Sequence, residues 1–315
     1  MRTALLATKL FVPPPRRGLG ARPQLIERLN AGLDRRLSLV SSPAGFGKTT
    51  LLSKWASQCR LPVTWLSLDE GDNDIHRFLS YLIAALQTVN GDIGQGLLAA
   101  LQSTATVDPE AILTTVVNGI VASPNGLILV LDDYHVIEST AVDAAMEFLL
   151  NHLPPIPVGA HLVIASRTDP SLPLPRLRAR GELTEIRESD MRFSHDEVAN
   201  YVLDVSSLPI SSDDLRTLQD RTEGWVTGLQ LATMAMQRLA DPDRISEFVK
   251  SFGSGHRYII DYLVDEVLNR QPLQVQEFLV QTSILDRLSA PLCDAVLDRA
   301  DSQRTLSQLE AANLF

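Results

Sequence analysis

The sequence is poor in cysteine, in aromatic residues and in long apolar runs. Only 2 of its 315 residues are cysteine and 5% are aromatic. Cys59 and Cys293 fit no metal-binding spacing, so we expect two free thiols and no disulfide framework. Apolar runs such as Leu127 to Leu131 are far too short to cross a bilayer. These shortages exclude a disulfide-stabilised scaffold and argue against a membrane-spanning protein.

Basic residues are also in deficit. The chain has 28 Lys and Arg against 38 Asp and Glu, a net charge of -10 and a pI near 5.1. Such a surface as a whole repels nucleic acid and anionic membranes. Lys9 interrupts the apolar N-terminal stretch and no small-residue cleavage site follows it, so we expect no signal peptide and a cytoplasmic location. A length of 315 residues predicts two or three domains.

Apolar runs of strand length recur through the first two thirds of the chain, with helical patterns between them. They lie at 37–40, 63–68, 127–131, 161–166 and 183–186. Near-continuous apolar strands separated by helices are typical of a parallel sheet covered on both faces. We therefore predict an extended segment at 1–20 and an α/β nucleotide-binding domain at 21–190.

Beyond Met191 the pattern becomes helical, with predicted helices at 194–204, 212–222, 225–239 and 257–268. Ser194 and Glu197 fit a capping box, and Ser212 before acidic residues fits a second helix start. We predict a helical lid domain at 191–251 and a further small domain at 252–315.

The stretch SSPAGFGKTT, residues 41–50, matches the phosphate-binding pattern G-x-x-x-x-G-K-[ST] except that Ser42 replaces the first glycine. A strand precedes it and a helix follows, which is the context the motif needs. Serine is tolerated there if its φ is negative. Lys48 would reach the outer phosphates and Thr49 would bind Mg²⁺. The predicted nucleotide-binding residues here are Ser42, Pro43, Ala44, Gly45, Phe46, Gly47, Lys48, Thr49 and Thr50. The alternative is an ordinary glycine-rich turn.

Charged residues follow two other predicted strands. Asp132 and Asp133 end the run LILVLDDYH, where Asp132 could hold Mg²⁺ and Asp133 could orient a water molecule. Arg167 follows HLVIAS, at the strand end where ligands of open α/β sheets bind, and could sense a γ-phosphate. The alternatives are a helix cap for the acidic pair and a surface position for the arginine. Together with the loop, these residues predict ATP or ADP and Mg²⁺ as cofactors.

A second acidic cluster, Asp69, Asp72 and Asp74, follows the strand at 63–68. It lacks the terminal glutamate of a calcium-binding loop. We expect a solvated loop with a helix cap rather than a metal site.

The ordered series SPAGFGKTTLLSKW, LVLDDYHVI, LVIASRTDPSLPLPRLRARGEL and TEGWVTGLQLA resembles the N-terminal part of the MalT-type transcriptional activators. These are LuxR-family regulators within the STAND class of signal-transduction ATPases, with an AAA+-like core. The resemblance runs from about residue 5 to 315. It implies a switch that rests as an ADP-bound monomer, exchanges ADP for ATP, self-associates and hydrolyses ATP slowly. It also implies that Trp225 and Arg22 lie near the nucleotide and that 252–315 begins a winged-helix domain.

Two other functions stay open: a turnover P-loop ATPase or kinase, and an interaction scaffold that does not hydrolyse nucleotide. Full-length family members carry a C-terminal helix-turn-helix, so we expect DNA binding only through a domain absent from this chain. The final LSQLEAANLF has a helix-to-strand pattern without a polar tail, which suggests a fragment of a longer protein.

Overall fold

The protein is described by a computed structural model that covers residues 5–14, 22–101, 108–206, 208, 210–239, 241–252, 264–269, 271–285 and 287–311. By their contacts these residues form two compact units. The first contains the described residues up to 41 and 48–190, and the second contains 42–47 and the described residues from 191 onward. The phosphate loop therefore groups with the helical half of the chain, although it joins a strand and a helix of the first unit.

The first unit is built on a five-stranded parallel sheet in the order β2-β3-β4-β1-β5. The strands agree with the predicted apolar runs to within one residue at each end. They are β1 (Leu37–Ser41), β2 (Val63–Ser67), β3 (Leu127–Asp132), β4 (Ala160–Ser166) and β5 (Leu183–Ile186). All residues of β1, β3 and β4 are buried, as expected for strands covered on both faces.

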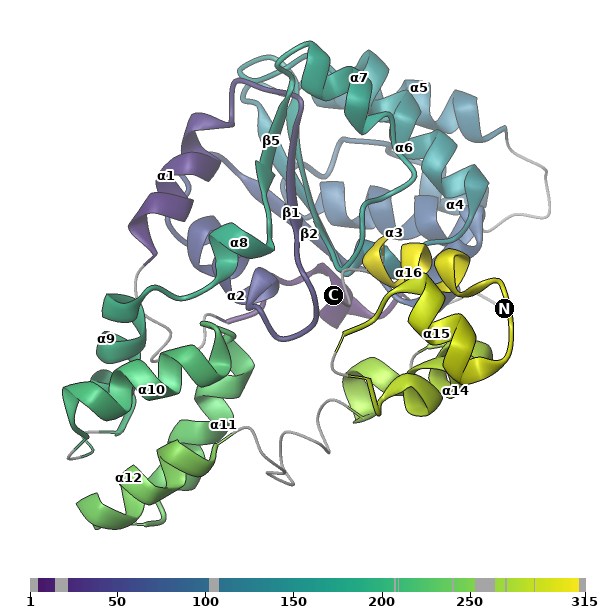
Figure 1. The fold of residues 1–315 in the computed structure, drawn as a ribbon. Helices are drawn as coiled ribbons and strands as arrows, with labels where there is room; N and C mark the ends of the chain where they lie inside the picture. Colours follow the sequence, from purple (N-terminus) through teal and green to yellow (C-terminus); the bar gives the residue numbers. More distant parts are fainter. Residues whose placement is uncertain are drawn as a thin grey trace. The chain divides into compact units, whose positions relative to one another are not determined.

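Helices cover both faces of this sheet, with α1 and α2 on one side and α5, α6 and α7 on the other (Figure 1). Alternate strand residues such as Leu129 and Leu131 enter the core formed with α3, α5 and α6, since successive side chains of a strand point to opposite faces. The helical elements are η1 (Ala7–Leu10), α1 (Pro23–Ala31), α2 (Lys48–Ala56), η2 (Glu70–Asn73), α3 (Ile75–Gln87), α4 (Leu97–Leu101), α5 (Pro109–Val121), η3 (Tyr134–Val136), α6 (Thr140–His152), α7 (Leu174–Ala179) and α8 (Glu188–Met191).

Among the described residues from 191 onward, all secondary-structure elements of the second unit are helices. Its elements are α9 (His195–Ser206), α10 (Ser212–Thr222), α11 (Val226–Met236), α12 (Pro242–Ser251), the short π-helix η4 (Val264–Leu268), α14 (Leu273–Thr282), α15 (Ala290–Leu297) and α16 (Ser302–Ala311). Helices α9 to α12 share one apolar core, and α14 to α16 share a smaller one around Phe278, Cys293 and Leu309.

Helix starts were predicted less accurately than strands. The capping box before α9 is confirmed, because Ser194 N–H donates to Glu197 Oε2 at 2.9 Å and Glu197 N–H donates to Ser194 Oγ at 3.3 Å. Before α10 the cap is Ser211 rather than the predicted Ser212, and its hydroxyl accepts from Asp214 N–H at 3.1 Å. The helix predicted at 225–239 spans Val226–Met236. Most of the one predicted at 257–268 lies outside the described residues.

Both cysteines are free, as predicted, with Cys59 half-buried and Cys293 buried. Within the part of the chain that the structure describes, no helix has the length and apolar character needed to cross a membrane.

Candidate functional site

The loop at 42–47 has the backbone that its glycines predict. Gly45 and Gly47 have φ of 80° and 85°, in the left-handed region that strongly favours glycine. Among the described non-glycine residues only Asp133, Glu223 and Asp298 have positive φ. Ser42 therefore lies outside the left-handed region, and serine in place of the first glycine carries no backbone strain of that kind. Its side chain is fully buried, so a small residue suits the position.

Lys48 is the first residue of α2 and only 8% exposed. Burial, with Arg167 acting in the same direction, lowers the pKa of Lys48 to about 8, while Asp133 and Asp132 act in the opposite direction. A lysine whose charged form is penalised in this way gains from an anion placed beside it. The free N–H groups at the start of a helix attract anions to the same place.

Thr49 and Asp132 bring two oxygen atoms together. Thr49 Oγ1 donates to Asp132 Oδ1 at 3.1 Å. Asp132 is 2% exposed, and burial, helped by the neighbouring Asp133, raises the pKa of its carboxyl to about 7. A hydroxyl and a carboxylate are hard ligands suited to Mg²⁺.

The described residues contain no group of three or more His, Cys, Asp or Glu side chains that could hold a metal. Mg²⁺ usually takes one or two protein ligands and completes its coordination with waters and phosphates. Thr49 and Asp132 therefore fit a magnesium ion that arrives with a phosphate chain.

Asp133 and Arg167 lie at the same edge of the sheet. Asp133 follows β3 with φ 59° and ψ 36°, an uncommon conformation for a residue other than glycine, and 48% of its side chain is exposed. His135 Nδ1 lies 3.8 Å from Asp133 Oδ1. Arg167 is half-buried and follows Ser166, which pairs in register with Ser41 at the end of β1. The structure thus brings Lys48, Thr49, Asp132, Asp133 and Arg167 together at the carboxyl ends of neighbouring strands.

Arg22, predicted to lie near the nucleotide, is half-buried just before α1. Its Nη2 donates to the backbone carbonyl of Asp190 at 3.0 Å. Arg28, one helical turn and a half further on, makes an ion pair of 2.8 Å with the carboxylate of the same aspartate. Contact of Arg22 with nucleotide stays a prediction.

The turn before α11 positions Trp225. It contains two successive left-handed residues, Glu223 with φ 49° and Gly224 with φ 73°. Trp225 N–H donates to Thr222 O at 2.8 Å, and Phe193 N–H donates to Gly224 O at 2.9 Å. A Cβ on Gly224 would lie 2.5 Å from Phe193 O, so the position requires glycine for space as well as for φ.

The start of α11 makes hydrogen bonds to the phosphate loop, and both segments belong to the second unit. Trp225 Nε1 donates to Ala44 O at 3.1 Å. Thr227 donates twice to Gly45 O, from its backbone N–H at 3.1 Å and from Oγ1 at 2.9 Å. The resemblance placed Trp225 near the nucleotide, and here its indole N–H bonds the loop. Thr227 was missed, because the only sequence signal was a hydroxyl in the first turn of an apolar helix.

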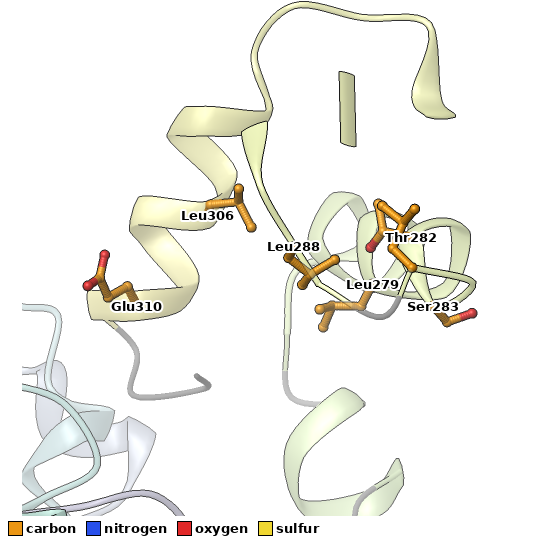
Figure 2. Close-up of a pocket in the computed structure, with 7 residues that line it drawn as sticks. Leu279, Thr282, Ser283, Leu288, Leu306 and Glu310 are labelled. Atoms are coloured by element: carbon orange, nitrogen blue, oxygen red, sulfur yellow. The ribbon is translucent and has the colours of Figure 1, made fainter. Parts of the chain in front are cut away.

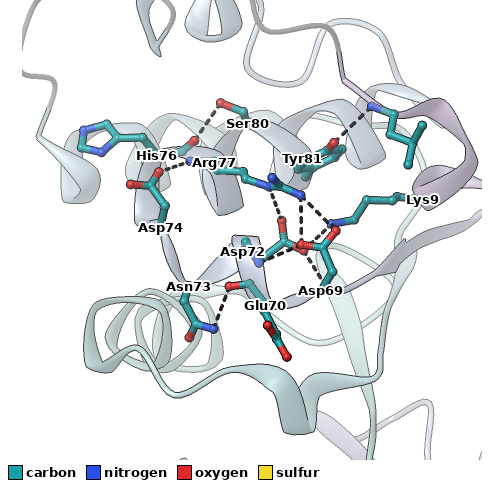
Figure 3. Close-up of polar contacts among 12 residues, drawn as sticks. Lys9, Asp69, Glu70, Asp72, Asn73, Asp74, His76, Arg77, Ser80 and Tyr81 are labelled. Carbon is teal, nitrogen blue, oxygen red and sulfur yellow. Dashed lines mark hydrogen bonds and ion pairs between the residues drawn. The ribbon is translucent and has the colours of Figure 1, made fainter.

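The second acidic cluster does not form the solvated loop that we expected, because Asp72 is fully buried. Lys9, from the N-terminal segment, makes a short ion pair with Asp72 and one of 3.0 Å with Asp69 (Figure 3). Arg77 Nε lies 3.2 Å from Asp72 Oδ1. The buried Asp72 carboxylate is thus paired with Lys9, a residue 63 positions away in sequence. The sequence prediction treated the acidic run as a local feature, and for Asp72 it is wrong.

The capping part of that prediction is confirmed. Asp69 Oδ1 accepts from Gly71 N–H at 2.9 Å at the start of η2, and Asp74 Oδ1 accepts from Arg77 N–H at 2.8 Å at the start of α3. The N-terminal segment is held further along by Tyr81, whose ring lies 4.3 Å from Lys9 Nζ and whose hydroxyl accepts from Leu6 N–H at 3.1 Å. This cluster therefore attaches the segment around η1 to α3.

A hollow of about 630 Å³ lies among the last described helices. Figure 2 shows side chains from the end of α14 and from α16 around it. Its lining is mostly leucine with few polar groups: Leu279, Thr282, Ser283, Leu285, Leu288, Leu306 and Glu310. It includes none of the predicted nucleotide-binding residues.

Comparison with known proteins identifies relatives along almost the whole chain. The family model of the MalT winged helix domain matches residues 264–315. The HTH-type transcriptional regulator MalT of Klebsiella pneumoniae (strain 342) is 34% identical over 312 residues, which is 99% of this chain and 34% of that protein. The MalT of Yersinia pestis (strain Pestoides F) gives the same figures. The chain thus spans about a third of the length of the curated relatives it matches.

Solved structures share the fold. A Walker-type ATPase of Pyrococcus abyssi aligns with a TM-score of 0.61 and 15% identity over 96% of this chain and 92% of its own. A STAND protein with a tetratricopeptide repeat sensor from Pyrococcus horikoshii aligns with a TM-score of 0.53 and 18% identity over 96% of this chain and 41% of its own. The chain therefore has a P-loop ATPase fold followed by helices and a winged-helix segment.

Proposed function

Because this chain is homologous to the MalT-type transcriptional regulators over 99% of its length, we propose that it is the nucleotide-controlled switch module of such a regulator. It binds ATP or ADP with Mg²⁺, hydrolyses ATP slowly and self-associates in the ATP form. The observation that carries this proposal is the meeting of Lys48, Thr49, Asp132, Asp133 and Arg167 at one edge of the sheet.

Each of these residues has a role that follows from its surroundings. Lys48 contacts the outer phosphates, whose charge offsets the burial that lowers the pKa of the lysine. Thr49 Oγ1 and the Asp132 carboxylate hold Mg²⁺, which when bound neutralises charge on the phosphates. Perturbed pKa values in a cluster of this kind are typical of functional sites.

Asp133 and Arg167 distinguish ATP from ADP. The half-exposed carboxylate of Asp133 orients the attacking water, and its left-handed backbone fixes where the side chain begins. Arg167 contacts the γ-phosphate, which only ATP carries. Arg22 contributes a further contact to the nucleotide.

Transcription regulation is the activity that the relatives' name states, and we propose it for the protein of which this module is part. The net charge of -10 opposes DNA binding by the surface of this module as a whole. DNA contact through a C-terminal domain outside these residues is what the resemblance to the regulators implies. The module contributes control: nucleotide sets its conformation, and conformation sets self-association.

Two measurements test this proposal against its rivals. Mass spectrometry of denatured protein detects nucleotide that stays bound through purification, and a steady-state phosphate-release assay gives the turnover rate. A switch carries ADP and turns over well below about 1 s⁻¹, whereas a turnover ATPase or kinase reaches about 1 s⁻¹ or more. Protein that carries no nucleotide and binds none when it is added is a scaffold, and that result would reject the proposal.

A further inference from the structure

We propose that Trp225 and Thr227, at the start of α11, are positioning residues for the phosphate loop. By holding two loop carbonyls they aim the adjoining loop N–H groups at bound phosphates, and they couple phosphate binding to the helical segment that follows. This inference rests on the proposed function. It adds to it the residues that connect phosphate binding at the loop to α11.

The geometry of the peptide bond links the outer side of the loop to its inner side. In a planar trans peptide the C=O and the N–H point in opposite directions. The Ala44 carbonyl shares its peptide with the Gly45 N–H, and the Gly45 carbonyl shares its peptide with the Phe46 N–H. Donors that fix these two carbonyls therefore fix the direction of two N–H groups. A phosphate loop binds its anion through such N–H groups.

Three hydrogen bonds join the start of α11 to the loop carbonyls. Ala44 O accepts one bond, from Trp225 Nε1 at 3.1 Å, and Gly45 O accepts two from Thr227, at 2.9 and 3.1 Å. A peptide whose carbonyl accepts a hydrogen bond becomes more polarised, so its N–H becomes a better donor. The donors on α11 thus both orient and strengthen the groups that face a phosphate.

Only glycine fits at position 45 beside Trp225 and Thr227. A Cβ at Gly45 would lie 2.6 Å from Thr227 Oγ1 and 2.7 Å from Trp225 Nε1, and the φ of 80° is itself costly for other residues. The loop and the helix start therefore approach as closely as a residue without a side chain allows.

The two donor residues, Trp225 and Thr227, lie next to residues that are packed in the core of the second unit. Val226 and Leu229 of α11 are 4% and 0% exposed in the core shared by α9 to α12. The indole packs against Gly228, where a Cβ would lie 2.6 Å from Trp225 Cε3. Because binding energies are reciprocal, a loop conformation selected by phosphate also favours the bonded state of α11.

The test uses protein stripped of nucleotide and two probes that separate the parts of ADP: inorganic pyrophosphate for the phosphates and adenosine for the base. Trp225→Phe keeps an aromatic ring but removes the N–H donor, and Thr227→Val removes one of the two Thr227 donors. Thr233→Val is the matched control, since this threonine is on the same helix, is 1% exposed and bonds Leu229 O within the helix. Calorimetric titration gives each affinity, and thermal unfolding without ligand checks the fold.

We expect Trp225→Phe to weaken pyrophosphate and ADP binding about three- to tenfold, the value of one neutral hydrogen bond. Thr227→Val weakens them less, because its N–H remains. Adenosine affinity and the unliganded melting temperature stay at the values of Thr233→Val. A merely structural role would lower the melting temperature and leave the ratio of pyrophosphate to adenosine affinity unchanged.

Three further results would overturn the inference. Pyrophosphate affinity equal to that of Thr233→Val would show that the indole N–H does not position the loop. A loss confined to adenosine would make Trp225 a base contact. Failure of the wild-type protein to bind pyrophosphate, ADP or ATP would reject the proposed function, and the inference with it.

Discussion

Two lysines of the first unit are almost equally buried and yet lie in opposite surroundings. Lys9 is 6% exposed and Lys48 is 8% exposed. Lys9 makes ion pairs with two carboxylates and lies over a tyrosine ring, so neighbouring side chains of the protein balance its charge. At Lys48, burial and Arg167 lower the pKa to about 8 despite two nearby aspartates. The first cluster stabilises the fold, and the second is where we propose that the phosphates of a nucleotide bind.

The largest effect that we expect is a loss in the free energy of unfolding when Lys9 is replaced. Lys9→Met leaves the fully buried Asp72 with Arg77 as its remaining cation, and removing one partner of a buried ion pair costs about 3 kcal/mol or more. Urea unfolding measures the loss in free energy of unfolding. The double variant Lys9→Met with Asp72→Leu should recover part of it, because it removes the uncompensated buried charge but also the oxygens that accept from Asp69 N–H and Arg77 Nε. A loss below about 1 kcal/mol in the single variant would refute the structural role of the cluster.

The next effect concerns pH and is confined to the proposed nucleotide site. The pKa of Asp132 is raised from its ordinary 3.8 to about 7, so between those values the folded state binds more protons than the unfolded state. Stability contributed by this group therefore falls as pH rises through that window, by at most about 1.4 kcal/mol per pH unit.

Lys48 gives the opposite slope at higher pH. Its pKa is lowered from 10.5 to about 8, so the folded state binds fewer protons between those values and its contribution rises with pH. Together the two groups stabilise the ligand-free protein least between about pH 7 and pH 8. Unfolding free energies measured across pH should lose the falling limb in Asp132→Asn and the rising limb in Lys48→Met. Parallel curves for wild type and both variants would contradict this account.

The smallest effect sharpens the comparison within the Lys9 cluster. Arg77 bonds the same two aspartates as Lys9, but 43% of its side chain is exposed. Solvent screens such a pair, so Arg77→Met should cost less than about 1 kcal/mol by urea unfolding. An equal loss in the free energy of unfolding for Arg77→Met and Lys9→Met would show that burial does not explain the difference expected between the two cations.

The same contrast shows what could be predicted from the sequence. The strands were predicted to within one residue because each is a short, largely apolar run between polar turns, and a parallel sheet buries both faces. The phosphate loop and the acidic pair at the end of β3 follow from local motifs. The structure adds that Gly45 and Gly47 are left-handed and that Thr49 and Asp132 are in contact.

What escaped prediction depends on residues far apart in sequence. Asp72 looked like part of a solvated loop, because nothing local indicates that Lys9 covers it. Thr227 looked like an ordinary helix residue, because its bond to Gly45 O spans 182 positions. The cap of α10 was placed at Ser212 instead of Ser211, since either of two adjacent serines satisfies the same pattern.

The most direct test of nucleotide binding compares replacement of Lys9 and of Lys48 in one experiment. Thermal unfolding of the wild type, Lys9→Met, Lys48→Met and the control Lys54→Met, on the same helix as Lys48, is recorded with and without Mg²⁺ and ADP. We predict that ADP raises the melting temperature of the wild type, Lys9→Met and Lys54→Met. Without ligand, Lys48→Met should melt at or above the wild-type temperature, because the cost of burying the lysine charge is removed. It should lose most of the ADP shift, because a hydrogen bond to a charged group contributes roughly 10- to 100-fold in affinity. An ADP shift of wild-type size in Lys48→Met, or none in the wild type, would contradict the account.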